Sequence, residues 1–444
     1  MWKMIRSVYL TQTFYLSMLA IVVLYVVGYK VHVAYAFAGP ALIILCILLV
    51  LDVSLLWISN KGLPGVRDTP DRMSNGDNNE IVISVKNRYT FPVRLTIIDE
   101  IPVQFQKRDF RITCQLQPGE EKRFSYLLRP LQRGEYLFGA LNIYVRGMIG
   151  FAERRYRYDQ NKMVQVYPSF MQMRKYELMV ISHRLTEAGL KTVRRMGHAM
   201  EFDQIRKYVI GDDYRTVNWK ATARKTELMV NQYQDEKAQQ VLSLIDTGRT
   251  MKMPFNGMTL LDYAINTSLV ISKITLNKYD KAGMFAFSSK IQCYVQADNK
   301  NNQMHAMQEA LYNIATDFAE SDFELVYTYV RKKLNQRSLL IIYTNFETRS
   351  SASRQLDFLI KLSKHHLVLV VIFENTEVQS LTRIDAESAE DLYIQTIAEK
   401  FIFEKKLIVK ELKKYGIHSI HTQPRDLTVK LINKYLELKA FSYI

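Results

Sequence analysis

The sequence predicts a three-part chain: paired N-terminal transmembrane helices, an all-β domain of immunoglobulin-like sandwich type, and a C-terminal α/β domain. Three observations support this fold class. Two charge-free apolar runs occupy most of residues 1–60. Short segments of alternating apolar and polar residues, separated by turn signals, fill 65–168. Apolar strands then alternate with helical segments over 228–444, which is typical of a mostly parallel sheet with helices on both faces.

The first element is a transmembrane helical hairpin over residues 1–60. Its spans are predicted at about 8–28 and 33–57, and each is close to the roughly 20 residues that cross a bilayer as a helix. Only the turn GYKVH separates them. A cleavable signal peptide has a single apolar run, so two consecutive runs favour a membrane anchor.

Flanking charge predicts the orientation of this hairpin. The turn between the spans carries only Lys30, whereas basic residues lie on the other side of both spans. The positive-inside rule then places both termini in the cytoplasm and the protein in the bacterial inner membrane. Asp52 is expected at the cytoplasmic boundary, with a buried functional carboxylate as the alternative. The flanking basic residues are Lys3 and Arg6 before the first span, and Lys61, Arg67 and Arg72 after the second.

The formal charge of +16 is concentrated in residues 1–230. Anionic lipid of the inner leaflet explains this excess, so a nucleic acid partner is not required. The three cysteines lie far apart and lack metal-ligand spacing, which fits a reducing compartment. The β segment over 65–168 contains no catalytic constellation and is interpreted as a spacer or a protein-contact module.

The α/β domain is predicted from its element order. In such sheets ligands bind at the carboxyl ends of strands, so the segments DTGRT and TNFE, which follow two buried strands, are the places to inspect. The basic helical stretch Glu404–Tyr415 is interpreted as a solvated face. Strands are expected at 239–246, 282–289, 291–296, 338–345 and 366–373, with a short one in IHSIHT, and helices at about 260–276, 303–318, 354–364, 391–415 and 427–438.

The sequence also resembles two known families. The segments IDTGRTM, AGMFAFSS and IIYTNFE resemble the framework of a von Willebrand factor A domain, which is Rossmann-like. The region over 169–227, a linker helix and a signature, resembles domain-of-unknown-function family 58. That resemblance implies a membrane-anchored cytoplasmic protein, often encoded beside a MoxR-type AAA+ ATPase, without an established enzymatic activity. The matching residues are Gly197, Glu201, Phe202, Arg206, Tyr208, Gly211, Asp212, Asp213, Arg215, Trp219, Ala223 and Arg224.

The resemblance to a von Willebrand A domain raises the question of Mg²⁺, which such domains often hold through hard oxygen ligands. Asp246 and Thr250 match the first loop, but Gly248 replaces a serine ligand and Asn345 replaces a carboxylate. The loop Ala297–Met304 offers no threonine. The site is therefore predicted to be degenerate and to need no cofactor. Mg²⁺ held by Asp246, Thr250 and Asn345 is the alternative, and under a purely structural interpretation Asp246 caps a helix or bonds a turn.

Four interpretations of the run RKYVIGDDYRTVNWKATARKTELMV (Arg206–Val230) remain open. As a catalytic centre, the carboxylates of Glu201, Asp203, Asp212 and Asp213 would gather around a metal in a metal-dependent hydrolase. As a nucleic-acid grip, its arginines and Trp219 would supply charge and a stacking face, although the interspersed acids weaken this hypothesis.

The two preferred interpretations of this run are not enzymatic. As a structural junction, Asp and Arg side chains would form bidentate pairs and Trp219 would be an apolar anchor. As a docking surface, the arginines and the tryptophan would contact a partner protein. We therefore expect a non-enzymatic adaptor whose partners are a MoxR-type ATPase and other A-domain membrane proteins. The alternatives are the hydrolase and a lipid or envelope sensor. The sequence has no Gly-rich phosphate loop of the Walker or dinucleotide type.

Overall fold

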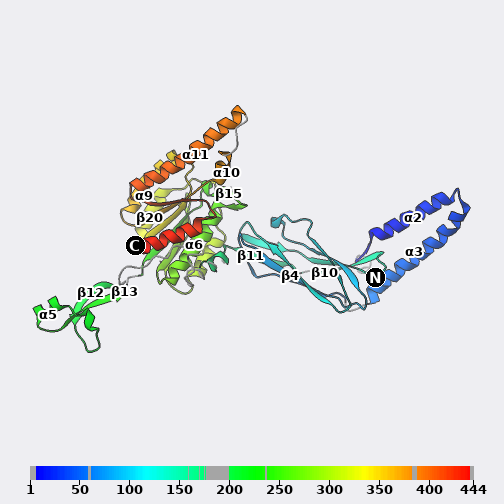
Figure 1. Ribbon diagram of the computed structural model, residues 1–444, viewed down its shortest axis with the longest axis horizontal. Coiled ribbons are helices and arrows are strands. Elements are labelled where there is room, and N and C mark those ends of the chain that lie inside the picture. The colour runs from blue at the N-terminus through cyan, green and yellow to red at the C-terminus, as the bar shows by residue number, and fades with distance from the viewer. Residues whose placement is uncertain are drawn as a thin grey trace. The chain divides into compact units, whose positions relative to one another are not determined.

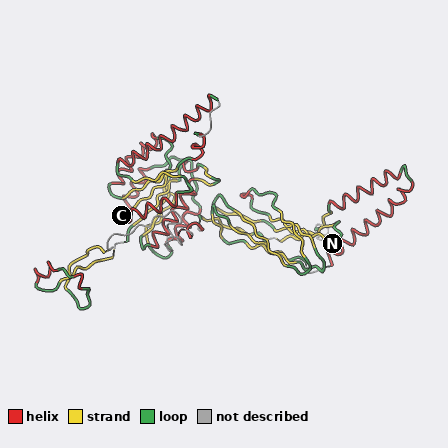
Figure 2. The backbone as a smooth tube through the Cα atoms, in the orientation of Figure 1, coloured by secondary structure: helices red, strands yellow, loops and turns green. Residues whose placement is uncertain are grey.

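The computed structural model describes residues 7–58, 62–158, 160–169, 171–174, 176, 200–235, 238–382 and 388–440. It divides the chain into two compact units, Met1–Tyr167 and Pro168–Ile444. Figures 1 and 2 show helices and strands in both units, with the apolar helices at the start of the first unit. Gly197 of the signature lies outside the described residues, as do the side chains of Glu201, Phe202 and Asp203.

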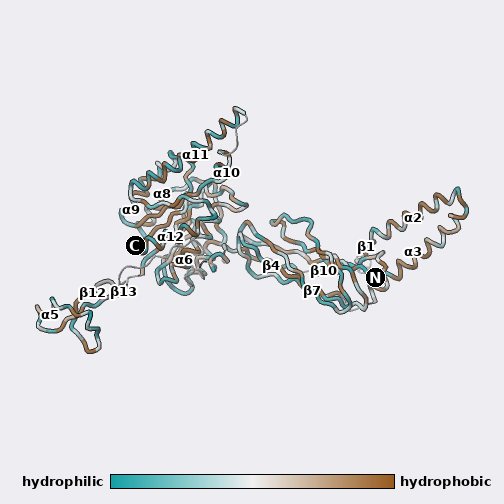
Figure 3. Tube along the Cα trace, in the orientation of Figure 1, coloured by the Kyte–Doolittle hydropathy of each residue, from teal (hydrophilic) through white to brown (hydrophobic). Residues whose placement is uncertain are grey.

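Two apolar helices form the N-terminal part of unit 1. The helix α2 spans Gln12–Gly28 and α3 spans His32–Ile58, and both are coloured as hydrophobic in Figure 3. Residues His32–Trp57 are long and apolar enough to cross a membrane, whereas α2 is apolar but shorter. The helices meet closely at the turn, because a Cβ atom on Gly28 would lie 2.8 Å from the backbone nitrogen of Tyr35.

The first apolar helix begins later than predicted. Residues Val8–Leu10 form the short strand β1, which pairs antiparallel with Ala152–Arg154 at the edge of the β domain. Thr11 continues this contact, since its backbone N–H donates to Phe151 O over 3.0 Å. The predicted start at residue 8 is therefore wrong. The sheet edge satisfies these backbone groups, and the helix can begin only after the pairing ends.

Asp52 is buried where the apolar helix meets the β domain, with 0 % of its surface exposed. Its Oδ2 accepts hydrogen bonds from the backbone N–H groups of Phe151 and Ala152, at 2.8 and 2.9 Å. Four residues later Leu56 belongs to the core of the β domain, and its carbonyl accepts from Tyr89 Oη. The helix α3 thus runs without a break from its apolar segment into this core, and the hydrogen bonds of Asp52 hold the helix to the edge of the β domain.

The β domain of unit 1 contains three sheets. Ile83, Leu95 and Ile143 come from two different sheets and share one hydrophobic core. The five-stranded sheet has the order β1, β10 (Ala152–Tyr158), β9 (Leu141–Arg146), β5 (Val93–Asp99) and β6 (Arg111–Leu116). One three-stranded sheet has the order β2 (Gly65–Asp68), β4 (Asn79–Lys86) and β7 (Glu121–Leu128). The other has the order β3 (Arg72–Ser74), β11 (Lys162–Tyr167) and β8 (Gly134–Phe138).

Arg67, one of the charges used to orient the hairpin, points into the β domain. Its Nη1 lies 2.5 Å from Asp99 Oδ1, and both side chains are almost completely buried. Tyr126 Oη donates to the other oxygen of Asp99 over 2.5 Å, and burial raises the pKa of Tyr126. A buried ion pair with further hydrogen bonds positions these strands, so Arg67 is not free to contact lipid headgroups.

Unit 2 is built on a six-stranded sheet with helices on both faces (Figure 1). Its order is β18-β17-β14-β19-β20-β21, and only the edge strand β18 is antiparallel to its neighbour. Its buried strands are long apolar runs, as expected for strands covered on both sides. The strands are β14 (Gln240–Asp246), β17 (Lys281–Phe287), β18 (Ile291–Asp298), β19 (Leu339–Thr344), β20 (Leu367–Phe373) and β21 (His418–Thr422).

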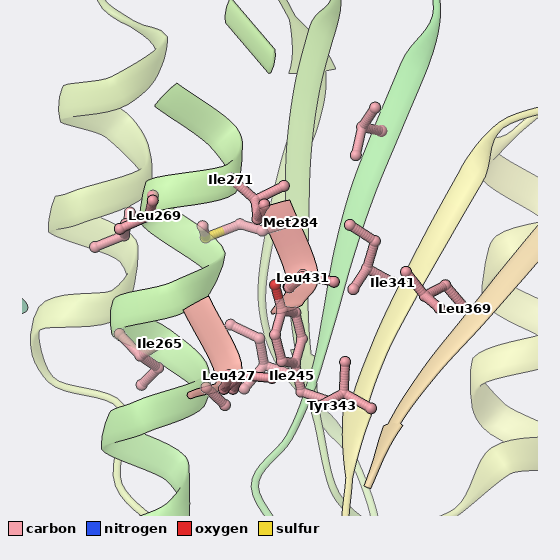
Figure 4. Packing of buried hydrophobic residues seen from close by; sticks show 14 of the residues in the cluster. Ile245, Ile265, Leu269, Ile271, Met284, Ile341, Tyr343, Leu369, Leu427 and Leu431 are labelled. Atoms are coloured by element: carbon pink, nitrogen blue, oxygen red, sulfur yellow. The ribbon is translucent and has the colours of Figure 1, made fainter. Parts of the chain in front are cut away.

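Two hydrophobic cores lie on the two faces of this sheet. One is formed with α6 (Leu260–Asn277), α7 (Gln303–Tyr312) and α12 (Leu427–Ala440). The other is formed with α8 (Phe323–Lys333), α9 (Arg349–Ser363) and the C-terminal half of α11 (Ala389–Lys414). Figure 4 shows part of the first core, which includes Ile265 and Leu269 of α6, Leu427 and Leu431 of α12, and Ile245, Met284 and Ile341 of the sheet.

The helices of unit 2 differ from the expected ones in four places. The helix α7 ends at Tyr312, six residues before the predicted end, and the chain then forms a loop. The helix α9 begins at Arg349, five residues before the predicted start. The helix α8 was not predicted, although Asp322 caps it by accepting from the N–H groups of Glu324 and Leu325. The short helix α10 (Thr376–Leu381) was also missed.

Candidate functional site

The strand order of unit 2 creates a topological switch point between β14 and β19. The chain connects β14 outward to β17 on one side, and β19 outward to β20 on the other. In open α/β sheets the crevice at the carboxyl ends of two such strands is the usual ligand site. Asp246 ends β14 and Thr344 ends β19, so both lie at this crevice.

Asp246 is the centre of a hydrogen-bonded cluster at the switch point. Its carboxylate accepts from Thr344 Oγ1 at 2.6 Å, from the Gly248 N–H at 2.8 Å, and from Ser321 Oγ. The side chain is buried, and burial raises the pKa of the Asp246 carboxyl while the three donors oppose that shift. The prediction that Asp246 bonds a turn is consistent with its bond to Gly248, two residues further along.

Ser321 occupies the space that a side chain at position 248 would fill. A Cβ atom on Gly248 would lie 2.2 Å from Ser321 Oγ and 3.1 Å from the Ala319 carbonyl oxygen. Gly248 has φ −68°, a value open to any residue, so its backbone does not require glycine. Gly248 has no side-chain hydroxyl to offer Asp246, and Ser321, in the loop between α7 and α8, offers one instead. The sequence had directed attention to Ala297–Met304 instead, and nothing local marked Ser321.

Asn345, which follows β19, faces a lysine. Lys405 Nζ donates to Asn345 Oδ1 over 2.9 Å and to the Phe373 carbonyl over 2.7 Å. Lys405 comes from α11 and is only 8 % exposed. Burial lowers the pKa of Lys405 to about 8, while the negative charges of Glu347 and Glu374 oppose the shift. The interpretation of this basic helix as a solvated face is wrong at Lys405.

The residues of this edge fit a divalent ion poorly. Thr250 lines the same small cleft as Asp246 and Asn345, with a volume of about 50 Å³. Both oxygens of Asp246 already accept hydrogen bonds, and the amide oxygen of Asn345 contacts an ammonium group. Mg²⁺ is held by carboxylates and prefers near-ideal octahedral geometry. A cation on Asn345 would also meet the positive charge of Lys405 at hydrogen-bond distance.

The signature run forms a β-hairpin that was predicted as a linker. Strand β12 (Met200–Lys207) pairs antiparallel with β13 (Met229–Asp235). The connection carries the short helices η3 (Tyr214–Thr216) and α5 (Trp219–Lys225), and Gly211 there has φ +111°, which favours glycine.

Local bonds occupy both adjacent acids of the run. Arg206 binds Asp212 through both guanidinium nitrogens, at 2.8 and 2.6 Å, and Asp212 also accepts from the Val209 N–H. The Arg206 side chain lowers the pKa of Asp212 through this hydrogen bond. Asp213 caps η3 by accepting from the Arg215 N–H at 3.0 Å. Within the described part of the chain no three acidic, His or Cys residues form a metal-sized group.

Trp219 is not the apolar anchor that the sequence suggested, because 71 % of its surface is exposed. It lies in the first turn of α5, and Asn218 caps this helix by accepting from the Ala221 N–H. Arg224 and Ala223 are also exposed, whereas Tyr208 is half-buried. The hairpin thus presents an aromatic and a basic side chain on a short, capped helix.

Comparison with known proteins places this region in a family. The family model described as "Protein of unknown function DUF58" matches residues 204–405. A relative from Bacillus subtilis (strain 168), "Uncharacterized protein YeaD", is 24% identical over 179 residues, which is 38% of this chain and 44% of that protein. The aligned part of this chain therefore spans less than half the length of that relative.

Solved structures resemble parts of the chain at low identity. BatB from Bacteroides thetaiotaomicron, a conserved hypothetical protein, is 13% identical with a TM-score of 0.30 and covers 46% of this chain and 100% of its own. The CARDB domain of the PF1109 protein from Pyrococcus furiosus is 18% identical with a TM-score of 0.16, covering 23% of this chain and 86% of its own.

Proposed function

Because residues 204–405 belong to the DUF58 family, we propose that the chain is a membrane-anchored, non-enzymatic adaptor that binds other proteins. The binding surface is the carboxyl edge of the unit 2 sheet around Asp246, Ser321, Thr344 and Asn345. The observation that carries this proposal is that the charged groups of that edge are bonded within the chain. Both oxygens of the Asp246 carboxylate accept hydrogen bonds, and the Lys405 ammonium donates two, so the described residues of this edge form no open catalytic constellation.

The proposed architecture extends the described one in three respects. The strand order of unit 2, with its acid at the end of β14, supports a von Willebrand A-like domain. The core shared by two sheets supports an immunoglobulin-like sandwich in unit 1. The length of α3 and the apolar character of both α2 and α3 support a two-span anchor, and flanking charge supports placing both termini in the cytoplasm of a bacterial cell.

A second contact surface is proposed on the signature hairpin. Exposed tryptophan and arginine side chains are the residue types that most often dominate protein interfaces. Trp219 and Arg224 are exposed on α5, and the Arg206–Asp212 pair braces the loop that leads to this helix. The proposed partner is a MoxR-type AAA+ ATPase, together with other A-domain membrane proteins, and this choice rests on the family resemblance. Local bonding of Asp212 and Asp213 disfavours the alternative of a metal-dependent hydrolase.

Co-purification tests this function directly. The full chain is extracted in mild detergent, with and without ATP, from cells that produce wild-type protein or a variant with Asp246→Asn, Trp219→Ala and Arg224→Ala. We expect the variant to lose the ATPase while remaining folded by circular dichroism. A Tyr279→Ala variant, which also removes an exposed aromatic ring, is the matched control. Retention of every partner by the triple variant would refute the proposed surfaces.

A further inference from the structure

A cavity of about 330 Å³ lies beside the cluster of Asp246, at the carboxyl ends of β19, β20 and β21. It is covered by α10 and α11, and its size reaches the range of small-ligand pockets, roughly 300–1,000 Å³. Its wall combines apolar side chains with a few polar groups, as ligand sites do. The apolar side chains are Met253, Val378, Phe401 and Ile402.

The polar groups in this cavity include donors that lack acceptors. Asn345 is 2 % exposed, and its Nδ2 has no hydrogen-bond partner among the described residues. Lys405 uses two hydrogen bonds there, whereas an ammonium group has three N–H donors. Unpaired buried donors are costly, so two of them on side chains that line one cavity point to a ligand that supplies an acceptor. A carboxylate is the acceptor that an ammonium and an amide N–H bind most strongly.

The face of α11 that leads to Lys405 is apolar and exposed. Ile394, Ile397, Phe401 and Lys405 follow one another at helical spacing, three or four residues apart, and therefore share one side of the helix. The first three are exposed, although Phe401 also lines the cavity. This apolar strip extends about 11 Å from Ile394 to Phe401 at 1.5 Å per residue. Ile394 and Ile397 do not line the cavity, so a ligand that covers the whole strip extends beyond it.

We propose that this site binds the C-terminus of a partner polypeptide, whose last residue is hydrophobic and carries a free carboxylate. The carboxylate lies against Lys405 Nζ and Asn345 Nδ2, the last side chain fills the apolar part of the cavity, and preceding residues cover the strip Ile394–Phe401. This inference rests on the adaptor function proposed above and specifies what its carboxyl edge recognises. Capture of a terminal carboxylate is an established mode of peptide recognition.

Lys405 shares the cavity wall with Glu347 and Glu374, whose negative charges oppose a carboxylate ligand and limit its affinity. Glu374 Oε1 already accepts from Gln379 Nε2 at 2.7 Å. Glu347 is exposed at the cavity rim, where it can accept from peptide N–H groups. His421 lines the same wall, and burial lowers its pKa, which keeps the imidazole neutral near pH 7. The ammonium group of Lys405 is therefore the one positive charge on the cavity wall among the described residues that line it.

The test is a binding measurement with paired peptides. Fluorescein-labelled hexapeptides ending in Val-Ile, with either a free carboxylate or a terminal amide, are titrated against the full chain in nanodiscs, with empty nanodiscs as background. We expect the free acid to bind about ten- to a hundredfold more tightly, because its carboxylate adds a charge-assisted hydrogen bond to Lys405 that the amide lacks. In Lys405→Met the two peptides should bind equally, whereas Lys406→Met, the exposed neighbouring lysine, should preserve the difference.

Two further arms identify the occupant. Ile397→Ser should weaken both peptides by the same factor, because the strip contacts side chains and not the carboxylate. Raising the pH from 7 to 9.5 should weaken only the free acid, because the Lys405 ammonium loses its proton around pH 8. Equal binding of acid and amide by wild type would overturn the inference while leaving partner capture in the co-purification experiment intact. Octanoate that displaces the peptide and binds more tightly would also overturn it, in favour of a fatty acid.

Discussion

The substitution Gly248→Ser restores the serine that adhesion-type metal sites carry, and we expect it to destabilise unit 2. The new Cβ would lie 2.2 Å from Ser321 Oγ and 3.1 Å from the Ala319 carbonyl, so the loop between α7 and α8 must move. Overpacking of this kind costs about 1–3 kcal/mol. Displacing Ser321 also removes a hydrogen bond to the Asp246 carboxylate, worth about 1.5–3 kcal/mol. Since the two effects overlap, we expect a loss of about 2–4 kcal/mol.

Removing the Ser321 hydroxyl should rescue this variant. In Gly248→Ser with Ser321→Ala the clashing atom is gone, and the new hydroxyl can donate to Asp246 in its place. Ser321→Ala alone should cost about 1.5–3 kcal/mol because a buried carboxylate loses a donor. The double-mutant cycle should therefore give a favourable coupling of about 1–3 kcal/mol.

Hydrogen exchange measures this effect without requiring two-state unfolding, which a membrane-anchored chain of two units does not guarantee. Amides of β14 report the local opening free energy of unit 2, and amides of β9 in unit 1 are the internal reference. A loss of about 2–4 kcal/mol corresponds to exchange about thirtyfold to several-hundredfold faster. Exchange in Gly248→Ser equal to wild type, or a double variant less stable than both single ones, would refute the placement of Ser321. Mg²⁺ should stabilise none of these variants unless Asn345→Asp is added.

Three further predictions concern other sites. Lys405 has a pKa of about 8 in the folded protein, below its ordinary value of 10.5, so between these pH values the unfolded chain binds more protons. The free energy of unfolding of the wild type should therefore rise with pH across that window, by up to about 3 kcal/mol relative to Lys405→Met in urea unfolding. Parallel pH curves for the two proteins would contradict this prediction. Asp52→Ala removes the acceptor of the Phe151 and Ala152 N–H groups, so hydrogen exchange at these two amides should be at least tenfold faster. Unchanged protection would show that Asp52 does not hold α3 to the β domain. Trp219→Ala should change stability by less than about 0.5 kcal/mol, because the indole is exposed; a larger loss in thermal unfolding would show that it packs.

The buried strands of unit 2 could be predicted because their signal is local. Gln240–Asp246, Leu339–Thr344 and Leu367–Phe373 are runs of apolar residues that cannot be solvated, and their alternation with helices indicates a parallel sheet. The same reasoning located Asp246 at a carboxyl edge. The mixed α/β character and an apolar N-terminal helix follow from composition in the same way. Helix α8 has Phe323, Val326 and Val330 at helical spacing, so the same kind of local signal was present there and was overlooked.

The partners at the site could not be predicted, because they depend on long-range contacts. Ser321 is 75 residues from Asp246, and Lys405 is 60 residues from Asn345. Lys405 stands in a run of lysines on α11, and the sequence alone does not indicate which of them points at the sheet. Trp219 shows the converse problem, since an aromatic residue in an ordered turn suggests a packed anchor, whereas the capped helix α5 exposes it.

The carboxyl edge retains groups that stability alone would not favour. Burial raises the pKa of Asp246 and lowers that of Lys405, so each charged form is opposed by its surroundings. A buried lysine can often be replaced by a packed apolar residue without loss of stability. Asp246 lies at the switch point, where the topology of the sheet directs ligands, and Lys405 lines the neighbouring cavity at the ends of β19 and β20. Titratable groups whose charged forms are disfavoured by burial, at the carboxyl edge of the sheet, are better explained by a role in binding a ligand than by a role in folding. Lys405→Met should therefore leave the fold intact and abolish carboxylate discrimination, whereas a mainly structural lysine would give the opposite result.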